Sequence, residues 1–348
     1  MTGNRVDTNN VPTLLTVEDL QVEFDTYGGA VQAVRGVNFS VNQGKTLAIV
    51  GESGCGKSVT VQSIMGLIPA PPGRIIAGSA RLRGHEILGR KTAGGREIRG
   101  AEIGMIFQDP MTSLNPTMKI GDQIAEPLQV HRGYSARNAS LEAVRLLELS
   151  RIPEASKRAR QYPFEFSGGM LQRAMIAMAL SCKPSILIAD EPTTALDVTI
   201  QAQILDLMQE LQKETGMAII LITHDLGVVA RMADEVAVMY AGKIVEYGSA
   251  NDIFYRSAHP YTVGLKEAMP TNDPARQHEL KPINGSPPDL FAPPAGCGYC
   301  SRCPYAMQIC SESQPQNNGL HDHHSASCWL HHSRSKLKPD TLFFGRAL

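Results

Sequence analysis

The segment Gly51-Glu52-Ser53-Gly54-Cys55-Gly56-Lys57-Ser58 has the spacing G-x-x-x-x-G-K-[ST] of a phosphate-binding loop. It follows an apolar run that ends at Val50 and precedes a helical run that starts at Val59, which is the setting that this motif needs. Glycines let backbone N–H groups turn toward phosphate oxygens, and the start of a helix adds partial positive charge. We expect Lys57 to reach the β- and γ-phosphates of a nucleotide and the Ser58 hydroxyl to ligate Mg²⁺. An ordinary glycine-rich turn is the alternative, and the flanking strand and helix disfavour it.

A second strand-like run, Ile186-Leu187-Ile188-Ala189, ends in the two carboxylates Asp190 and Glu191. A strand in the same sheet as the P-loop strand would bring both acids to the phosphate-binding edge. We expect Asp190 to hold the Mg²⁺ shell, because a hard cation prefers carboxylate oxygens. Glu191 would orient and deprotonate the attacking water. A solvated acidic pair at a strand end is the alternative.

Five cysteines near the C-terminus have the spacing C-x2-C-x2-C-x6-C-x17-C: Cys297, Cys300, Cys303, Cys310 and Cys328. In a chain that starts without a secretory signal, such clustering favours a metal over disulfides. The part that ends in Cys303-Pro304 partly matches a bacterial ferredoxin run, but the x3 spacing and a final Cys-Pro are missing. An iron–sulfur cluster, a structural zinc ion and no metal at all remain open.

Several other histidines and cysteines could do chemistry, but ordinary structural roles are favoured for them. The histidines His321, His323, His324, His331 and His332 suggest a metal site, but their irregular spacing in a polar stretch favours a solvated tail. The Cys55 thiol is incidental if the loop presents its backbone to phosphate, and Cys182 is expected to pack at a helix end.

The elements that position these residues are short apolar runs alternating with helical stretches. The runs Thr46–Val50, Ser185–Ala189 and Ala218–Thr223 are continuous, which is typical of strands covered on both faces in a largely parallel sheet. Helical signals dominate between about residues 112 and 166 and predict a helical insertion. The fold class is therefore α/β, and 348 residues with 43% apolar content are ample for a real core.

The composition changes near residue 256. The last 93 residues hold 11 of the 22 prolines, 7 of the 10 histidines and 5 of the 7 cysteines. We expect a flexible tail at residues 1–12, a nucleotide-binding domain at 13–255 and a Cys/Pro-rich extension at 256–348. The extension is too poor in apolar residues to build a large core alone, so a metal or docking must hold it.

The charge balance excludes several classes of protein. With 33 Lys and Arg against 34 Asp and Glu, the formal charge is −1, and the chain has no basic footprint for nucleic acid. No apolar run approaches the roughly 18 residues of a membrane-spanning helix, and the polar start is not a secretory signal. We expect a cytoplasmic chain that serves a membrane, if at all, as a peripheral subunit.

With these motifs in place, the chain resembles the ATP-binding cassette (ABC) superfamily. Phe166-Ser167-Gly168-Gly169-Met170-Leu171-Gln172-Arg173 is similar to its signature, with Met170 where glutamine is commoner. The resemblance implies a P-loop NTPase cassette with a mixed, largely parallel sheet and a helical insertion. It also implies that Ser167, Gly168, Gly169, Met170 and Asp197 complete the ATP site of a partner subunit, Asp197 through the loop Ala195-Leu196-Asp197.

The remaining family elements occur in order. Gln108 resembles the glutamine that senses Mg²⁺ and links to the membrane partner, and His224 resembles the switch histidine that contacts the γ-phosphate. The resemblance thus implies that Mg²⁺ is held by Ser58, Gln108 and Asp190. We expect Phe24 to stack on adenine, with Tyr27 as the alternative, because stacking needs only a flat face.

Longer stretches are similar to the peptide/nickel importer ATPases, most closely to the D-type ATPases of oligopeptide permeases. These stretches are Met105–Pro116, Ala189–Thr199, Thr223–Ala230, His259–Thr262, Gly296-Cys297 and Arg302–Pro304. The resemblance implies a second, similar ATPase in a heterodimer, two membrane permeases and an external peptide-binding protein. Residues 109–130 would form part of the groove for a permease coupling helix. D-type relatives match Cys297, Cys303, Cys310 and Cys328, where some hold a [4Fe–4S] cluster, and Cys300 is an additional thiol that could substitute as a ligand.

The resemblance implies an ATPase at the cytoplasmic face of the inner membrane that powers uptake of oligopeptides, with dipeptides, glutathione or nickel as alternative cargo. Two chains must close on ATP before water attacks, because Lys57 and Ser167 of one chain belong to different sites. A soluble ABC ATPase for DNA or ribosomes is a remote alternative, since the chain has one cassette and no sustained heptads. An iron–sulfur redox protein is another, but no flavin or nicotinamide site accompanies the cysteines.

Overall fold

The computed structural model describes residues 12–88, 98–194, 196–269, 281–321 and 323–336. The expected tail at residues 1–12 thus falls almost entirely outside the described residues, as does Ala195. The chain divides into two compact units, each formed by several segments. The first unit comprises the chain up to Thr16, Ser40–Thr46 and Ala80–Ile220, and the second comprises Val17–Phe39, Leu47–Ser79 and the chain from Leu221.

In the first unit, two buried parallel strands carry polar residues at their carboxyl ends. Strand β6 (Ile103–Ile106) pairs with β7 (Ile186–Asp190), with Ile103 opposite Ile186 and Ile106 opposite Ala189. All residues of both strands are buried, as their continuous apolar runs predict. The register brings the residues after Ile106 and those after Ala189 to the same edge.

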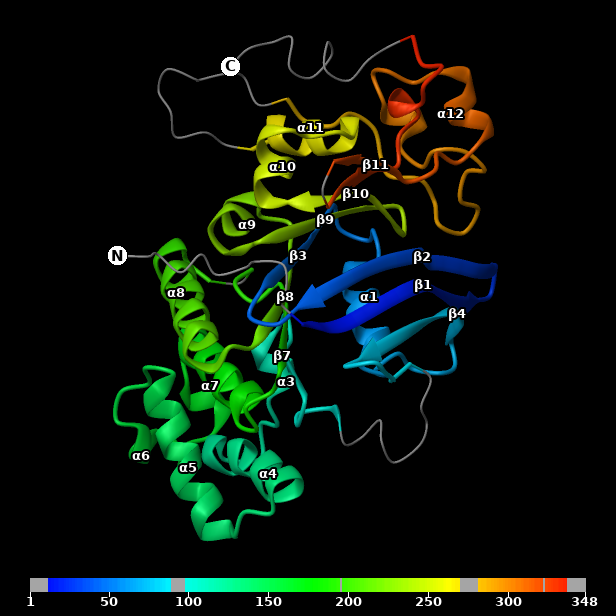
Figure 1. The fold of residues 1–348 in the computed structure, drawn as a ribbon. Helices are drawn as coiled ribbons and strands as arrows, with labels where there is room; N and C mark the ends of the chain where they lie inside the picture. The colour runs from blue at the N-terminus through cyan, green and yellow to red at the C-terminus, as the bar shows by residue number, and fades with distance from the viewer. Residues whose placement is uncertain (1–11, 89–97, 195, 270–280, 322, 337–348) are drawn as a thin grey trace, which may run out of the picture. The chain divides into compact units, whose positions relative to one another are not determined.

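Most of the helices of the first unit gather around one apolar core (Figure 1). These helices are α3 (Pro110–Ser113), α4 (Ile120–Arg132), α5 (Ala136–Leu149), α6 (Ala155–Arg158), the 3₁₀ turn η2 (Pro163–Glu165) and α7 (Gly168–Leu180). The sequence sets their ends: Gly133, at φ 66°, terminates α4, and the Ser135 hydroxyl accepts the Asn138 N–H at the start of α5. Helix α8 (Val198–Thr215) has an Asp197 cap and ends at Gly216, at φ 69°.

In the second unit, the central strand is β3 (Thr46–Val50), whose residues are all buried. It pairs in parallel with β9 (Glu235–Tyr240), β9 pairs antiparallel with β10 (Lys243–Ser249), and β10 pairs with β12 (His324–Ala326). Strand β11 (Asn318–His321) completes this side of the sheet. Strand β8 (Ala218–Thr223), also fully buried, contributes residues to both units.

Four further strands and several short helices complete the fold. Strands β1 (Thr13–Thr26), β2 (Gly29–Asn42), β4 (Gly73–Leu82) and β5 (His85–Glu86) form a sheet in the order β2-β1-β4-β5. The helices of the second unit are α1 (Lys57–Ile64), α9 (Leu226–Met232), α10 (Ala250–Tyr255), α11 (Pro260–Glu267) and α12 (Gln308–Glu312), with the 3₁₀ turns η4 (Cys300–Arg302) and η5 (Trp329–His331).

The C-terminal region is built into the core of the second unit. The tyrosines Tyr240, Tyr261 and Tyr299 are buried together, with ring centroids 4.5–5.4 Å apart, and Cys297 and Cys303 pack against the same cluster. Burial of large aromatic side chains is the main source of such stabilisation. The C-terminal region was expected to be held by a metal or by docking, and this packing provides the docking.

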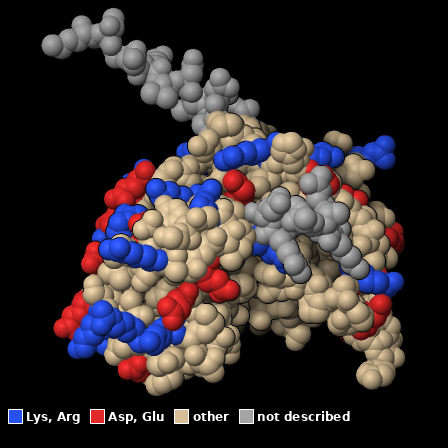
Figure 2. Space-filling view, turned by 90° about the horizontal axis from the view of Figure 1, so that it is seen from below, with Lys and Arg blue, Asp and Glu red and all other residues tan. Residues whose placement is uncertain are grey.

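Positive and negative side chains are mixed on the surface, in keeping with the near-neutral composition. On the face that Figure 2 draws, the Lys and Arg side chains of the described residues are interspersed with Asp and Glu. In the part of the chain that the structure describes, no helix combines the length and the apolarity of a membrane span.

Candidate functional site

The glycine-rich loop connects β3 to α1, as its motif predicts, and its glycines have backbone angles that other residues rarely adopt. Gly51, Gly54 and Gly56 have φ values of 157°, 78° and 102°. A Cβ atom on Gly56 would lie 2.3 Å from the carbonyl oxygen of Ala33, and one on Gly51 would lie 2.1 Å from that of Met239. Only glycine fits at these two positions.

Lys57 is the first residue of α1, and its side chain folds back over the loop. Its ammonium donates hydrogen bonds to the carbonyl oxygens of Gly51 and Glu52, both at 2.9 Å, and the residue is 5% exposed. A buried cation is thus held over a curled backbone, which is the arrangement that attracts phosphate. Ser58 and Val59 follow in the first turn of α1, both half-buried, and Ser53 is exposed.

Cys55 lies inside this loop, with its Sγ 3.9 Å from the Lys57 ammonium. Burial raises the pKa of its thiol above the ordinary value of 9.0, although Lys57 acts in the opposite direction. The side chain is 5% exposed, so the thiol packs and stays protonated near neutral pH.

At the carboxyl ends of β6 and β7, the structure brings Gln108 and Glu191 together. The Gln108 amide donates to Glu191 Oε2 at 2.9 Å, and the Thr194 hydroxyl donates to the same oxygen at 3.0 Å. Glu191 has a φ of 46°, an uncommon angle for a residue with a side chain, and Asp190 before it is 3% exposed. Thr194 lies in the stretch Ala189–Thr199, which resembles the peptide importer ATPases, but the sequence alone assigned it no role.

The signature segment lies beside the segment that contains Asp197, in the same unit. Ser167 caps α7 by accepting the Met170 N–H, and Asp197 caps α8 by accepting the Ile200 N–H. Gly168 and Gly169 would contact Leu196 and Ile200 if they carried Cβ atoms, at 4.0 and 3.0 Å. Ser167, Gly168 and Asp197 are exposed, and Val198 beside them is 83% exposed.

The remaining predicted nucleotide contacts lie in the second unit. His224 is exposed in the turn between β8 and α9. Phe24 is half-buried on β1, and a Cβ on Gly73 would approach its ring to 3.1 Å. Tyr27 is fully exposed in the turn between β1 and β2. Both aromatic rings have solvent access, so the preference for Phe24 stays a prediction.

Two residues of the C-terminal region contact the phosphate-binding loop, and the sequence reasoning missed both. The Arg302 guanidinium lies 2.7 Å from Glu52 Oε2, and the Glu52 N–H donates to the Tyr261 hydroxyl at 2.9 Å. Arg302 is 5% exposed on its side chain and also donates to the hydroxyl of Tyr240. Both residues lie in stretches that resemble the peptide importer ATPases, His259–Thr262 and Arg302–Pro304, but nothing in the sequence linked them to Glu52.

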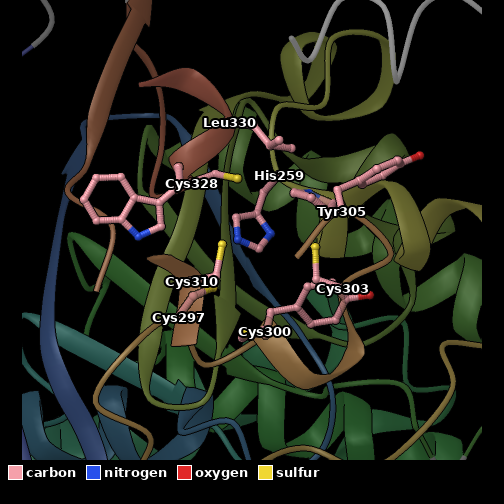
Figure 3. Close-up of a pocket in the computed structure, with 11 residues that line it drawn as sticks. His259, Cys297, Cys300, Cys303, Tyr305, Cys310, Cys328 and Leu330 are labelled. Carbon is pink, nitrogen blue, oxygen red and sulfur yellow. The ribbon is translucent and has the colours of Figure 1, made fainter. Parts of the chain in front are cut away.

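All five clustered cysteines line one small cavity of about 10 Å³ (Figure 3). They come from the segment before η4, from η4 and its end, from α12 and from the start of η5: Cys297, Cys300, Cys303, Cys310 and Cys328. Burial and the neighbouring cysteines raise the pKa of Cys297 to about 11 and those of Cys303 and Cys328 to about 12. Several thiolates in this cavity would therefore need a cation to compensate them.

His259 projects into the same cavity, and its ring lies among the sulfurs of Cys303, Cys310 and Cys328 in Figure 3. Its Nδ1 accepts the Tyr261 N–H at 3.1 Å, so the proton of the neutral ring is on Nε2. Burial lowers the pKa of His259 to about 3. The buried Nε2 has no hydrogen-bond partner among the described residues. An N–H donor thus points toward a group of sulfurs.

The expectation of a solvated histidine tail was wrong for His324, which is 2% exposed. Its Nε2 lies 3.0 Å from the buried carboxylate of Glu246, and its strand β12 pairs with β10. His331 is half-buried and lies 2.7 Å from the Ala258 carbonyl, whereas His323 is exposed. Irregular spacing did not reveal this burial because the partners lie about 75 residues earlier in the chain.

Comparisons with known proteins agree with this geometry. The ABC transporter family matches residues 34–194, and the family described as oligopeptide/dipeptide transporter, C-terminal region, matches residues 245–310. The chain is 54% identical to the dipeptide transport ATP-binding protein DppD of Bacillus subtilis, over 93% of this chain and 96% of that protein. It is 56% identical to the oligopeptide transport ATP-binding protein OppD of the same organism, over 94% and 92%.

Further relatives extend the similarity. The oligopeptide transport ATP-binding protein OppD of Salmonella typhimurium is 54% identical over 87% of this chain and 89% of its own length. Among solved structures, the ATP-binding cassette MJ0796, a dimer in a post-hydrolysis state with ADP and Pi, superposes with a TM-score of 0.61 at 25% identity. It covers 68% of this chain and 99% of its own.

Proposed function

We propose that this chain powers the uptake of oligopeptides in particular. The chain belongs to the ABC transporter family and is the ATP-hydrolysing subunit of an oligopeptide or dipeptide importer. One observation carries the link between ATP and transport. Glu52 of the phosphate-binding loop contacts Tyr261 and Arg302, which belong to the region typical of peptide transporters. Dipeptides, glutathione and nickel are the alternative cargoes.

We propose that Lys57 binds the β- and γ-phosphates and that Ser58, Gln108 and Asp190 hold Mg²⁺. The carboxylate of Glu191 accepts a proton from water as the water oxygen bonds to the γ-phosphorus and the bond to the ADP oxygen breaks. The hydrogen bonds from Gln108 and Thr194 fix that carboxylate and support this role. His224 contacts the γ-phosphate, and Phe24 stacks on adenine.

Two ATPase subunits close on ATP before hydrolysis in this proposal. The exposed Ser167, Gly168 and Asp197 are available to a second chain, and the MJ0796 cassette is a dimer in its solved structure. Each site then combines Lys57 of one chain with the signature of the other. The lower affinity of ADP for the closed pair lets it reopen, and this difference in affinity drives the cycle.

The peptide importer family implies membrane permeases as partners. We propose a heterodimer with a similar ATPase, docked on two permeases at the cytoplasmic face of the membrane and supplied by an external peptide-binding protein. Residues 109–130 would form part of the groove for a permease coupling helix. Met111 and Val130 are 63% and 69% exposed there, and exposed apolar side chains suit a docking surface.

We propose that the cysteine cavity opens to hold a [4Fe–4S] cluster and does not hold zinc. Among the described residues, the one group of three ligand atoms that all lie within 4.8 Å of each other contains no cysteine. Zinc with bonds of about 2.3 Å needs its sulfurs about 3.8 Å apart, whereas a cubane holds them further apart. We propose Cys297, Cys303, Cys310 and Cys328 as ligands, with Cys300 as a substitute and His259 Nε2–H as a donor to a sulfur. A bound cluster would supply a multi-thiolate anchor for this region.

Metal analysis tests the cluster. The chain would be purified without oxygen, and iron, acid-labile sulfide and zinc would be measured together with a visible spectrum. We expect about four iron and four sulfide per chain. Zinc without iron would indicate a structural zinc site instead, and the absence of both metals would refute the cluster.

Reconstitution tests the transport function. The chain would be co-purified with its membrane subunits and placed in vesicles with ATP on the ATPase side. We expect labelled oligopeptides to be taken up in preference to dipeptides, glutathione and nickel. Lys57→Ala should abolish hydrolysis and uptake, and Glu191→Gln should trap a closed, ATP-loaded complex. Normal turnover of the Glu191→Gln complex, or ATP hydrolysis without uptake of any peptide, would contradict the proposal.

A further inference from the structure

Three ligand-type side chains converge outside the cysteine cavity, where the β11–β12 hairpin lies over the start of α10. Among the described residues, Asp252, His321 and His324 are the one group whose ligand atoms all lie within 4.8 Å of each other. His321 and His324 face each other in the register of the hairpin, and Asp252 lies in α10. The three residues therefore come from two segments about 70 residues apart that share one unit.

The distances suit a single metal ion. His324 Nδ1 lies 3.1 Å from His321 Nε2, and His321 Nε2 lies 3.7 Å from Asp252 Oδ1. A tetrahedral zinc ion with bonds of about 2.0–2.2 Å to nitrogen and oxygen sets its ligands about 3.3 Å apart. The third pair, Asp252 Oδ1 and His324 Nδ1, also lies within 4.8 Å, so the three atoms approach the spacing that one ion requires.

His324 is oriented as a metal ligand. Its Nε2 donates to Glu246 Oε1 at 3.0 Å, and the Glu246 carboxylate also accepts the backbone N–H groups of Ala258 and His259. Since this carboxylate can only accept, the ring proton of His324 is on Nε2 and the lone pair of Nδ1 faces His321. A carboxylate behind a histidine ligand fixes the tautomer and raises the basicity of the ligating nitrogen.

Asp252 supplies an anionic oxygen that has no hydrogen bond of good geometry. Its Oδ2 accepts the hydroxyl and N–H of Ser249, whereas the buried Oδ1 accepts none. The Arg256 guanidinium, whose side chain is 58% exposed, lies 2.6 Å from Oδ1, and a bound metal ion would replace it there. Gly248 makes room for the His324 ring beside α10, because a Cβ there would lie 2.9 Å from Cδ2 of that ring.

We propose that Asp252 Oδ1, His321 Nε2 and His324 Nδ1 form a site for a divalent transition-metal ion of the zinc type. Two imidazoles and one carboxylate are a ligand set that zinc accepts, and solvent reaches the fourth position because the side chain of His321 is 42% exposed. The ion would fasten the hairpin to α10. The proposal is independent of the transport function and of the cysteine cluster.

Metal titration of matched full-length variants tests the site. Wild type, His321→Ala and Asp252→Asn would be titrated with Zn²⁺ by equilibrium dialysis, with His323→Asn as the control. His323 is exposed and has a left-handed φ of 58°, which asparagine tolerates. We expect one zinc fewer per chain, or a Kd raised at least tenfold, in His321→Ala and Asp252→Asn and a Kd within twofold of wild type in His323→Asn. The cysteines are the same in all four proteins, so their zinc cancels in the comparison.

Cobalt gives a second readout that identifies the ligands. Co²⁺ bound by two histidines and a carboxylate shows d–d absorption bands without the charge-transfer band of cobalt–thiolate bonds. We expect His321→Ala to lose d–d intensity and to keep any thiolate band. Equal zinc binding in wild type and His321→Ala, equal losses in His321→Ala and His323→Asn, or a cobalt spectrum of thiolate type alone would each overturn the proposal. In those cases His321 and His324 form a hydrogen bond only.

Discussion

At the scale of single residues, the carboxylate of Glu191 is held by its neighbours rather than by its own backbone. Both the Gln108 amide and the Thr194 hydroxyl donate to the same oxygen, Oε2. Two donors on one oxygen fix the orientation of the carboxylate. Thr194 is therefore a positioning residue for the proposed base, a role that the sequence alone did not predict.

Thr194→Ala should slow hydrolysis without weakening ATP binding. Removing one exposed hydrogen bond costs about 1 kcal/mol, which corresponds to about a fivefold lower kcat. The KM for ATP should stay unchanged in steady-state assays of the assembled transporter. Thr194→Ser keeps the hydroxyl and should retain the wild-type kcat; an equal loss in both variants would argue against a role for the hydrogen bond.

The Cys55 thiol should react slowly and only at high pH. Its pKa is raised by burial, and only the thiolate is alkylated, so the rate should rise about tenfold per pH unit up to the raised pKa. An ordinary thiol reaches its plateau near pH 9, whereas the rate for Cys55 should continue to increase above that pH. Iodoacetamide labelling followed by mass spectrometry measures the rate, with Cys55→Ser to identify the peptide. A plateau below pH 9 would contradict the assignment.

At the scale of elements, the conformation of the phosphate-binding loop depends on glycines with positive φ. Gly54 and Gly56 both have left-handed angles, but only Gly56 also approaches another backbone segment closely. An alanine at Gly54 would therefore show the cost of backbone strain alone, and an alanine at Gly56 would add the cost of a steric clash.

Gly56→Ala should disrupt the loop, and Gly54→Ala should do so much less. A side chain at positive φ costs about 1–2 kcal/mol in either variant. Gly56→Ala adds a Cβ at 2.3 Å from the Ala33 oxygen, which forces the backbone to move. We expect at least tenfold weaker ATP binding and a lower Tm for Gly56→Ala than for Gly54→Ala, measured with a fluorescent nucleotide and by thermal unfolding. Equal effects would mean that the close approach is unimportant.

Local patterns predicted the elements well. The strand predicted at Thr46–Val50 coincides with β3, that at Ala218–Thr223 coincides with β8, and helices occupy the stretch from α4 to α6. Continuous apolar runs and glycine positions are local signals, so they can be recognised without knowledge of the tertiary structure. The clustering of the five cysteines was also visible in their spacing.

At the scale of the whole molecule, the contacts that sequence reasoning missed are long-range. Glu52 and Arg302 are 250 residues apart, and Glu246 and His324 are 78 residues apart. No periodicity links such positions, because they meet only through the pairing of β10 with β12 and the packing of Tyr240, Tyr261 and Tyr299. The buried histidine was misjudged for the same reason.

Arg302→Met should weaken both folding and ATP binding. The substitution leaves the Glu52 carboxylate without its cation. Because Glu52 is partly exposed, the free energy of unfolding should fall by about 1–3 kcal/mol, which lowers the Tm by about 2–10 °C. The unpaired carboxylate would also repel phosphate and raise the KM for ATP. The double variant Glu52→Gln/Arg302→Met removes that charge and should restore the KM; a KM unchanged in Arg302→Met would show that the pair does not influence the nucleotide.

The pairing of β12 with β10 affects how the chain folds during its synthesis on the ribosome. The outer edge of β10 is completed by a strand made roughly 80 residues later, which at about 5–20 residues per second leaves the edge open for several seconds of synthesis. An open strand edge invites pairing with other nascent chains. A message truncated before β12 would therefore yield a chain that is prone to aggregate. The chain most needs a chaperone during this interval of translation.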